Sequence, residues 1–363
     1  MWRSRTWQQY YDETAEFAKS CISIGLQRFE GVGILGSNAP EWLIANAGAI
    51  FAGAIPAGIY TTNGPDACHY ILEHCDAAIA VVDDESQLAK LLEVRHRLPR
   101  LKAIVVWQWR DGSKDGNGVY SWGSFIRLGD RISDDELQQR IGVQLPGHCA
   151  TLIYTSGTTG LPKGVMLSHD NLTWTPRSAQ QMLVTDANDH LVSYLPLSHI
   201  AAQMTDIHGP MAIGNTVWFA EPDALKGSLA ETLREVRPTR FMAVPRVWEK
   251  IEEKLREVGA ANTGIKKRIG EWAKDLGFRT QRSRYAVGSL DLVVVVIVVV
   301  AHHCLTMIRA LATECKATPT YHGAIAWRTP LCSRTSRRPS ASIDARRWPA
   351  APLPSRSKRC ITL

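Results

Sequence analysis

The stretch Tyr154-Thr155-Ser156-Gly157-Thr158-Thr159-Gly160-Leu161-Pro162-Lys163-Gly164 decides the fold of this 363-residue chain and indicates its chemistry. It combines hydroxyl side chains, three glycines and one lysine in a single run. Glycine lets the backbone turn sharply and brings its N–H groups close to an anion. The hydroxyls add further donors, and Lys163 adds a positive charge. The run therefore predicts a loop that holds a polyphosphate.

Apolar, β-prone residues flank this loop, with Cys149–Thr155 leading into it and Val165–Leu167 leading out of it. We expect the loop to join two strands. Its spacing differs from that of the common phosphate loop, which needs a Gly-Lys-Ser/Thr triplet and opens directly into a helix. A kinase or a GTPase is therefore disfavoured. The plain alternative is a turn that merely links two strands, but a simple hairpin needs fewer than these eleven residues.

The run Tyr154–Gly164 resembles the signature loop of the adenylate-forming (AMP-binding) superfamily, which includes acyl-CoA synthetases, luciferases and peptide-synthetase adenylation domains. Further segments are similar in the same order along the chain. Together they most resemble the bubblegum-type branch of the long-chain fatty acyl-CoA synthetases, over about residues 6–284. These further segments are Asn38–Trp42, Gly58–Asn63, Leu195–Ala201 and Val244–Lys250.

The resemblance implies an α/β fold, the large N-terminal domain of the adenylate-forming enzymes, present in incomplete form. It implies ATP-dependent activation of a fatty acid to acyl-AMP and then transfer to CoA, with ATP and Mg²⁺ as cofactors and CoA as co-substrate. His199 would lie beside the acyl pocket. The loop would wrap the β- and γ-phosphates through the ATP-binding residues Thr155, Ser156, Gly157, Thr158, Thr159, Gly160, Leu161, Pro162 and Lys163.

Several sequence elements of the family are missing from the chain. There is no Tyr-Gly-x-Ser/Thr-Glu run, whose threonine and glutamate bind the α-phosphate and Mg²⁺ in the family, no Thr-Gly-Asp run for the ribose, and no small lid domain with its catalytic lysine. The catalytic residues therefore stay unassigned. We expect an acid–thiol ligase by descent, a long-chain fatty acid–CoA ligase that is inactive or weakly active in this form. The alternatives are a non-catalytic nucleotide- or partner-binding module and an unstable truncated isoform without function.

Short apolar runs alternate with helical stretches from Thr6 onward, which is typical of an α/β sheet. Glu41–Phe51 is predicted to be a helix, and Pro56–Tyr60 the approach to the next strand. A helix over about residues 86–97 joins two strands, and a crossover of that length fits a parallel pair. The predicted strands are Gly31–Leu35, Ala77–Val82 and Ala103–Val106.

A later helix is predicted where Val247, Ile251, Leu255 and Val258 recur at helical spacing, with charged residues between them. We expect the apolar face to pack on a core and the charges to be solvated. Arg246, at the start of this helix, is left open between an anion contact and a surface cap.

The positive charge of the chain is concentrated in its last part. The net charge is +7, yet residues 285–363 alone carry eleven Lys or Arg and three Asp or Glu, so residues 1–284 carry −1. A nucleic-acid partner for residues 1–284 is therefore not expected. The boundary near residue 284 also divides the predicted domains: a partial AMP-binding domain over 1–284, and a non-homologous, basic, disordered tail over 285–363.

Within the tail, Leu292–Val300 is an apolar run of nine residues, about half the length of a membrane-spanning helix. Ser333–Arg359 mixes Arg, Ser, Pro and Ala without periodicity, which is typical of disorder. A basic membrane-binding arm is one interpretation. The interpretation we favour is foreign sequence from an altered reading frame or a retained intron.

The cysteine pattern indicates free thiols. Eight cysteines are present without Cys-x-x-Cys spacing, and the N-terminus lacks the apolar core of a signal peptide. A reducing, cytoplasmic location is expected, with peripheral contact to intracellular membranes left open. The oligomeric state also stays open. We predict no metal site, because neither His69, His74 and Cys75 nor His302–Cys304 has a matching second group of ligands.

Overall fold

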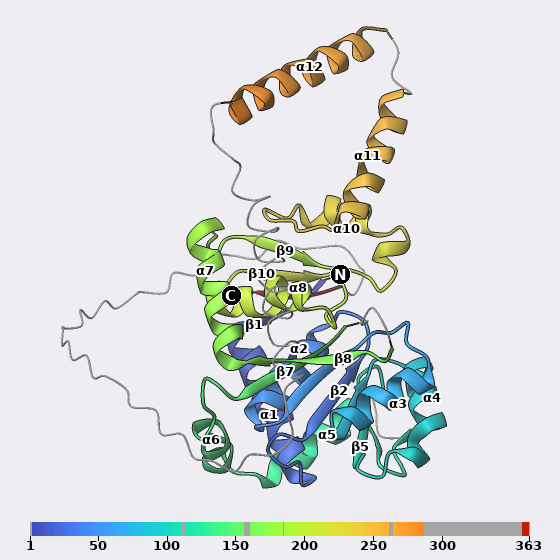
Figure 1. Ribbon diagram of the computed structural model, residues 1–363, viewed down its shortest axis with the longest axis vertical. Coiled ribbons are helices and arrows are strands. Elements are labelled where there is room, and N and C mark those ends of the chain that lie inside the picture. The colour runs from blue at the N-terminus through green and yellow to red at the C-terminus, as the bar shows by residue number, and fades with distance from the viewer. Residues whose placement is uncertain are drawn as a thin grey trace, which may run out of the picture.

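The computed structural model describes residues 2–109, 114–155, 160–183, 185–260, 264–286 and 358–362, which build two sheets flanked by helices (Figure 1). The larger sheet has seven strands. Neighbouring strands run parallel except the last two, which are antiparallel. In spatial order these strands are β6 (Val119–Ser121), β5 (Ala103–Val106), β4 (Ala77–Val82), β2 (Gly31–Leu35), β3 (Ile55–Ile59), β7 (Cys149–Thr155) and β8 (Lys163–Ser168).

The central strands are apolar throughout because helices cover both faces of this sheet. Every residue of β2, β4 and β5 is buried. Successive side chains of a strand point to opposite faces, so Ile79 and Val81 of β4 join one core while Ala80 and Val82 join the other. One core includes helices α1 (Trp7–Ser23), α2 (Pro40–Phe51), α5 (Trp122–Arg127) and α6 (Asp134–Gly142), and the other α3 (Pro65–His74) and α4 (Glu85–Val94).

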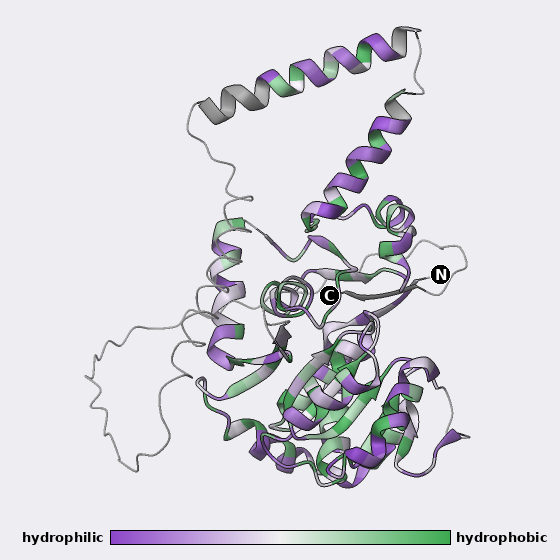
Figure 2. Ribbon diagram, turned by 45° about the vertical axis from the view of Figure 1, so that its right-hand side comes forward, coloured by the Kyte–Doolittle hydropathy of each residue, from purple (hydrophilic) through white to green (hydrophobic). Residues whose placement is uncertain are grey.

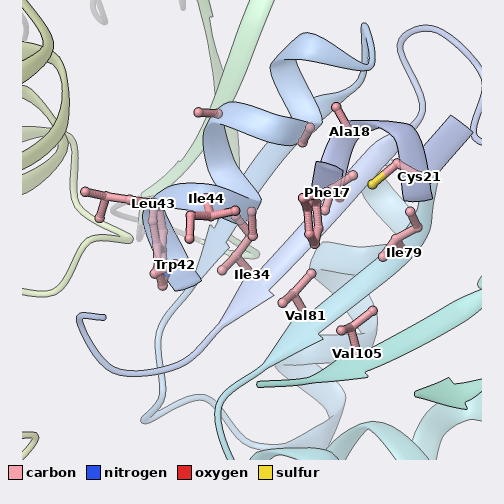
Figure 3. Close-up of a cluster of buried hydrophobic side chains, with 14 of the residues drawn as sticks. Phe17, Ala18, Cys21, Ile34, Trp42, Leu43, Ile44, Ile79, Val81 and Val105 are labelled. Carbon is pink, nitrogen blue, oxygen red and sulfur yellow. The ribbon is translucent and has the colours of Figure 1, made fainter. Parts of the chain in front are cut away.

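The first of these cores is centred on α1 and α2. Figure 3 shows Phe17 of α1 and Ile34 of β2 in the same cluster as Val81 and Val105, and all four side chains are fully buried. Helix α1 begins at a capping box, in which the Thr6 hydroxyl accepts from the backbone N–H of Gln9 and the Gln9 side chain accepts from the backbone N–H of Thr6. The packed helix thereby has a defined start.

The second sheet has four strands, in the order β1 (Trp2–Thr6), β11 (Lys358–Thr362), β10 (Thr216–Phe219) and β9 (His190–Ser193). A third core, which includes Val192, Tyr194 and Leu229, packs beside it. The remaining helices before residue 240 are α7 (His169–Leu183), α8 (Ile200–Gln203), a π-helical turn (Met204–His208), α9 (Gly209–Ile213) and α10 (Leu229–Val236). Short 3₁₀ turns lie at Arg95–Arg97, Leu128–Arg131 and Ala224–Lys226.

Helices α11 (Pro245–Ala260) and α12 (Gly264–Ala286) extend away from both sheets, and Figure 2 shows hydrophilic and hydrophobic residues alternating along them. The predicted apolar face of α11 is only partly correct. Val247 is buried and Ile251 packs against the third core, but Leu255 is 66% exposed. The prediction is wrong for Leu255 because the helix has passed the edge of the core by the second half of its length.

Most of the strands and helices predicted from the apolar runs are confirmed. Strands β2, β4 and β5 have the predicted bounds, β4 and β5 are parallel, and α4 with its 3₁₀ turn joins them. One assignment needs correction: Pro56–Tyr60 is not an approach to a strand, since residues 55–59 are strand β3 itself.

The predicted disordered tail falls mostly on residues outside the described ranges, including Leu292–Val300. Its last part is described, and there the prediction is wrong: Lys358–Thr362 forms β11 between β1 and β10. An unpaired strand edge offers a row of N–H and C=O groups to any extended segment. Local composition does not reveal such a long-range pairing partner.

Candidate nucleotide-binding site

Strands β7 and β8 form the predicted hairpin around the loop. Thr155 is opposite Lys163, and Tyr154 is opposite Gly164, so the first and last residues of the ATP-binding set meet at the mouth of the loop. Lys163 and Leu161 are exposed, and Gly160 has a φ of +99°, a conformation that favours glycine. Ser156–Thr159 lie outside the described residues, so their predicted role stays a prediction.

The loop follows the carboxyl end of β7, which runs parallel to β3. The carboxyl ends of parallel strands meet at one edge of a sheet, and ligands of open α/β sheets bind outside that edge. Asn38 follows β2 by three residues, and Tyr60 follows β3 directly. The sheet therefore places both of these side chains at the same edge as the loop.

Helix α3 is tied to both ends of the loop. The Tyr70 hydroxyl donates to the Pro162 carbonyl over 2.9 Å, and His74 Nδ1 lies 2.9 Å from the Tyr154 hydroxyl oxygen. Tyr154 is 3% exposed, and burial raises its pKa above the ordinary range, so the hydroxyl keeps its proton. A Cβ on Gly164 would lie 3.3 Å from the Tyr154 ring, a tight contact to which the ring would have to adjust by a few tenths of an ångström. The sequence interpretation considered His74 only as a metal ligand and did not single out Tyr70.

His199 forms the N-cap of α8, where its Nδ1 accepts the backbone N–H of Ala201 over 3.1 Å. Although the residue as a whole is exposed, desolvation of the ring lowers the pKa of the imidazole. Since Nδ1 is occupied as an acceptor, the neutral ring carries its proton on Nε2. The structure thus gives His199 a fixed orientation and a defined tautomer, while its place beside an acyl pocket stays a prediction.

Asn38 joins the larger sheet to the segment that carries His199. Its side-chain amide donates to Ser193 Oγ (2.9 Å) and to the Leu195 carbonyl (2.8 Å), and its Oδ1 accepts the backbone N–H of Leu197 (3.3 Å). Each bond spans more than 150 residues of sequence. The family-like segments that begin at Asn38 and at Leu195 are therefore in direct contact.

The Gly58–Asn63 segment also contacts the segment that begins at Leu195, through Ser198. A Cβ on Gly58 would lie 2.7 Å from Ser198 Cα, so only glycine fits at this approach. Burial raises the pKa of Tyr60, and a hydrogen bond with the Ser198 side chain partly opposes that shift. Arg246 is exposed at the start of α11, and both of its interpretations stay open.

Two titratable groups lie just beyond α8, in the π-helical turn, where Asp206 is buried and His208 is partly buried. Asp206 is 6% exposed, and burial raises its pKa to about 7 despite hydrogen bonds from Thr205 and Ser193. Burial lowers the pKa of His208 to about 4, and its Nε2 atom is buried and has no hydrogen-bond partner among the residues that the structure describes. Sequence reasoning missed both residues, because a single charge within an apolar run gives no local signal of its burial.

The described ranges contain no group of three or more His, Cys, Asp or Glu side chains placed as metal ligands. His69 instead lies against Arg97 and Glu73, and His74 against Tyr154. The second histidine group, His302–Cys304, falls outside the described residues. None of the described helices has both the length and the apolar character that crossing a bilayer requires.

Solved structures with similar folds are adenylate-forming enzymes. The anthranilate CoA ligase AuaEII in complex with anthranoyl-AMP aligns with a TM-score of 0.57 at 24% identity, covering 66% of this chain and 45% of that one. The A-PCP didomain of the carboxylic acid reductase from Segniliparus rugosus, in complex with AMP, aligns with a TM-score of 0.59 at 20% identity, covering 72% and 39%. The fold is that of the N-terminal domain of these enzymes.

Sequence relatives are more similar and more specific. The long-chain-fatty-acid–CoA ligase ACSBG2 of Xenopus laevis is 54% identical over 284 residues, covering 77% of this chain and 38% of that protein. ACSBG2 of Homo sapiens is 47% identical over 285 residues (78% and 42%), and ACSBG1 of Mus musculus is 47% identical over 276 residues (75% and 38%). The chain thus spans about two fifths of the length of these curated relatives.

A family model described as AMP-binding enzyme matches residues 1–312. That range contains the β7–β8 hairpin and its loop, the Asn38 contacts and His199, which are the features that the fold brings together. With the bubblegum-type CoA ligases as its relatives in sequence and the adenylate-forming domains as its neighbours in structure, this chain belongs to the AMP-binding enzyme family.

Proposed function

We propose that residues 1–284 are the nucleotide- and fatty-acid-binding part of a long-chain fatty acid–CoA ligase. Loop 155–163 would hold the ATP polyphosphate, and His199 would lie beside the acyl chain. The observation that carries this proposal is the opposition of Thr155 and Lys163 at a loop whose two ends are tied to α3. The names of the relatives, long-chain-fatty-acid–CoA ligases, support the substrate class.

The donor set of the hairpin fits a polyphosphate. Lys163 is exposed at the loop mouth. The hairpin itself offers Lys163 no acidic partner, because residues 149–168 contain no Asp or Glu. The Thr155 hydroxyl and the Lys163 ammonium can both donate to phosphate oxygens. Mg²⁺ would arrive on the ATP phosphates and neutralise part of their charge. The chain's own residues would bind and orient the leaving pyrophosphate.

Nucleotide titrations test the polyphosphate role. We expect Mg-ATP to bind the 363-residue chain at least about tenfold more tightly than AMP, since each charge-assisted contact to the outer phosphates contributes about 1.5–3 kcal/mol. ADP should bind with intermediate affinity. Equal affinities for ATP and AMP would show that the loop does not bind the outer phosphates, and would contradict the proposal.

Turnover is a separate proposal. The sequence lacks the runs that support the α-phosphate and the ribose in the family, so we propose that this chain makes little or no acyl-CoA from palmitate, ATP and CoA. Losing those groups costs several kcal/mol of transition-state stabilisation, on the order of a thousandfold in rate. Pyrophosphate release at roughly 1 per second or faster would show that other residues supply the missing groups.

The same measurements separate the alternative functions. A chain that binds Mg-ATP but releases no pyrophosphate would be the non-catalytic binding module. A chain that neither binds nucleotide nor unfolds cooperatively would be the unstable isoform. The domain boundary near residue 284 is likewise a proposal. The match to the family model extends past this boundary, to residue 312.

We further propose a cytoplasmic location with peripheral membrane contact through α11 and α12. Trp248, Leu255, Trp272 and Phe278 are exposed there and alternate with charged residues, an arrangement that suits the surface of a bilayer. Sedimentation with anionic vesicles should carry the chain down, and Trp272→Ser with Phe278→Ser should reduce the bound fraction. Equal sedimentation of the parent and the double variant would contradict this contact.

A further inference from the structure

Tyr60 lies where the larger sheet meets loop 155–163. Strand β3 ends one residue earlier, so Tyr60 is the first residue beyond the carboxyl end of that strand. Within the pair of β3 and β7, Gly58 is opposite Ile153. Continuing this parallel register by two residues brings Tyr60 beside Thr155, the first residue of the loop.

Tyr60, Thr155 and Lys163 form a row on one face of the sheet. Successive side chains of a strand point to opposite faces, and Ile59 and Tyr154 belong to the core beneath α3 and α4. Tyr60 and Thr155 therefore point to the other face. Lys163 is opposite Thr155 in the pair of β7 and β8 and shares its face. The row thus crosses the ends of three neighbouring strands at the mouth of the loop.

The same face of the sheet contacts the segment that carries His199. A Cβ on Gly58, which shares the face of Tyr60, would lie 2.7 Å from Ser198 Cα. The Tyr60 hydroxyl is hydrogen-bonded with the Ser198 side chain. Ser198 is 4% exposed and immediately precedes His199, which caps α8. Tyr60 therefore connects the row at the loop to the residue next to His199.

The distance between these two places matters for the formation of an acyl-adenylate. The carboxylate of the fatty acid must reach the α-phosphorus of ATP, and a misplacement of about 1 Å costs roughly a hundredfold in rate. A ligase therefore needs a fixed separation between its phosphate subsite and its acyl subsite. Tyr60 stands between the residues proposed for these subsites, with Thr155 on one side and Ser198 on the other.

We propose that Tyr60 is a positioning residue that fixes the separation between loop 155–163 and His199, so that Mg-ATP bound at the loop changes the surroundings of the His199 ring. Its hydroxyl acts through Ser198 and does not touch the phosphates. This inference rests on the proposed function, which assigns the loop to ATP and His199 to the acyl chain.

NMR spectra of the full chain with ¹³C-labelled histidine test the proposal. The ring signal of His199, identified by its loss in His199→Gln, should shift when the parent is saturated with Mg-ATP. Tyr60→Phe should reduce that shift at least about twofold, because the path to Ser198 is broken. Calorimetry of the same variant should show a loss of Mg-ATP affinity below about tenfold. Tyr120→Phe, which removes a hydroxyl from β6 at the far edge of the sheet, is the control and should keep the parent's shift.

A double-mutant cycle separates the hydrogen bond from simple packing of the ring. Ser198→Ala removes the other partner of the same bond, so it should reduce the His199 shift as much as Tyr60→Phe does. The double variant should show no further reduction.

Three NMR outcomes would overturn the proposal: no shift in the parent at saturating Mg-ATP, an undiminished shift in Tyr60→Phe, or additive reductions in the double variant. A loss of Mg-ATP affinity of about tenfold or more in Tyr60→Phe would also overturn it, by placing the hydroxyl on the phosphates. If the parent does not bind Mg-ATP at all, the proposed function itself fails. Calorimetry reports that outcome separately from the NMR shift.

Discussion

The Tyr70 hydroxyl donates a hydrogen bond to the Pro162 carbonyl over 2.9 Å, across 92 residues of sequence. This bond ties α3 to the far end of the phosphate loop, while His74 of the same helix meets Tyr154 at the near end. The Tyr70 and His74 rings lie 5.5 Å apart, so one helical turn carries both contacts. A loop held at both ends loses less conformational freedom when it closes on a ligand.

We expect Tyr70→Phe to weaken Mg-ATP binding about two- to tenfold, because the loop loses one anchoring hydrogen bond of roughly 0.5–1.5 kcal/mol. Isothermal titration calorimetry measures the change. Tyr11→Phe is the matched control, since Tyr11 of α1 packs against Phe51 of α2 and the substitution removes the same hydroxyl. Equal affinities of the two variants would show that the Tyr70 bond does not position the loop.

Asn38→Ala should lower the free energy of unfolding by about 1–3 kcal/mol. The substitution removes three hydrogen bonds and leaves the Leu197 N–H and the Leu195 carbonyl without this partner. Urea denaturation followed by circular dichroism gives the value. Asn188→Ala, at an exposed turn, is the control and should change the free energy by less than about 0.5 kcal/mol. If Asn38→Ala is as stable as the parent, the hydrogen bonds of Asn38 do not hold the segments that begin at Asn38 and at Leu195 together.

The free energy of unfolding of Asp206→Asn, relative to that of the parent chain, should increase as the pH rises. The carboxyl has a pKa of about 7 in the folded chain and an ordinary value of 3.8, so between these values the folded state holds the extra proton. The contribution of this carboxyl to the parent's free energy of unfolding therefore falls by about 1.4 kcal/mol per pH unit as the pH rises between the two pKa values. The stability difference between Asp206→Asn and the parent should grow by that slope between about pH 4 and pH 7.

His208→Gln provides the comparison of opposite sign. Its imidazole has a pKa of about 4 when folded against an ordinary 6.5, so the unfolded state holds the extra proton between these values. The parent gains stability at this group as the pH rises, and it loses that gain on acidification. The difference between His208→Gln and the parent should fall with rising pH. A pH-independent difference for either variant would contradict the burial of that group.

The hairpin and the central strands could be predicted from the sequence because their signals are local. Glycines and hydroxyls between two β-prone runs define the loop, and continuous apolar runs define β2, β4 and β5. The contacts that shape the site are not local. Tyr70 meets Pro162, and Asn38 meets Leu195, across separations of 92 and 157 residues, and no periodicity encodes such pairs.

Two of the corrected predictions have the same physical origin. Leu255 continues a helical apolar pattern, but whether it packs depends on how far the third core extends beneath α11. Lys358–Thr362 belongs to the tail that is predicted to be disordered, but pairing with the edges of β1 and β10 makes it a strand. Local pattern sets which elements form, and the neighbouring surface decides which of their faces are covered.

Calorimetric titration of Lys163→Ala with Mg-ATP tests the central claim, the phosphate role of the loop, most directly. Lys163 is exposed at the loop mouth opposite Thr155, so its removal should cost one charged contact and little stability. We predict that affinity falls about ten- to a hundredfold, corresponding to about 1.5–3 kcal/mol. Lys226→Ala, a surface lysine outside the site, should bind like the parent. Unchanged affinity in Lys163→Ala would contradict the assignment of this loop to the ATP phosphates.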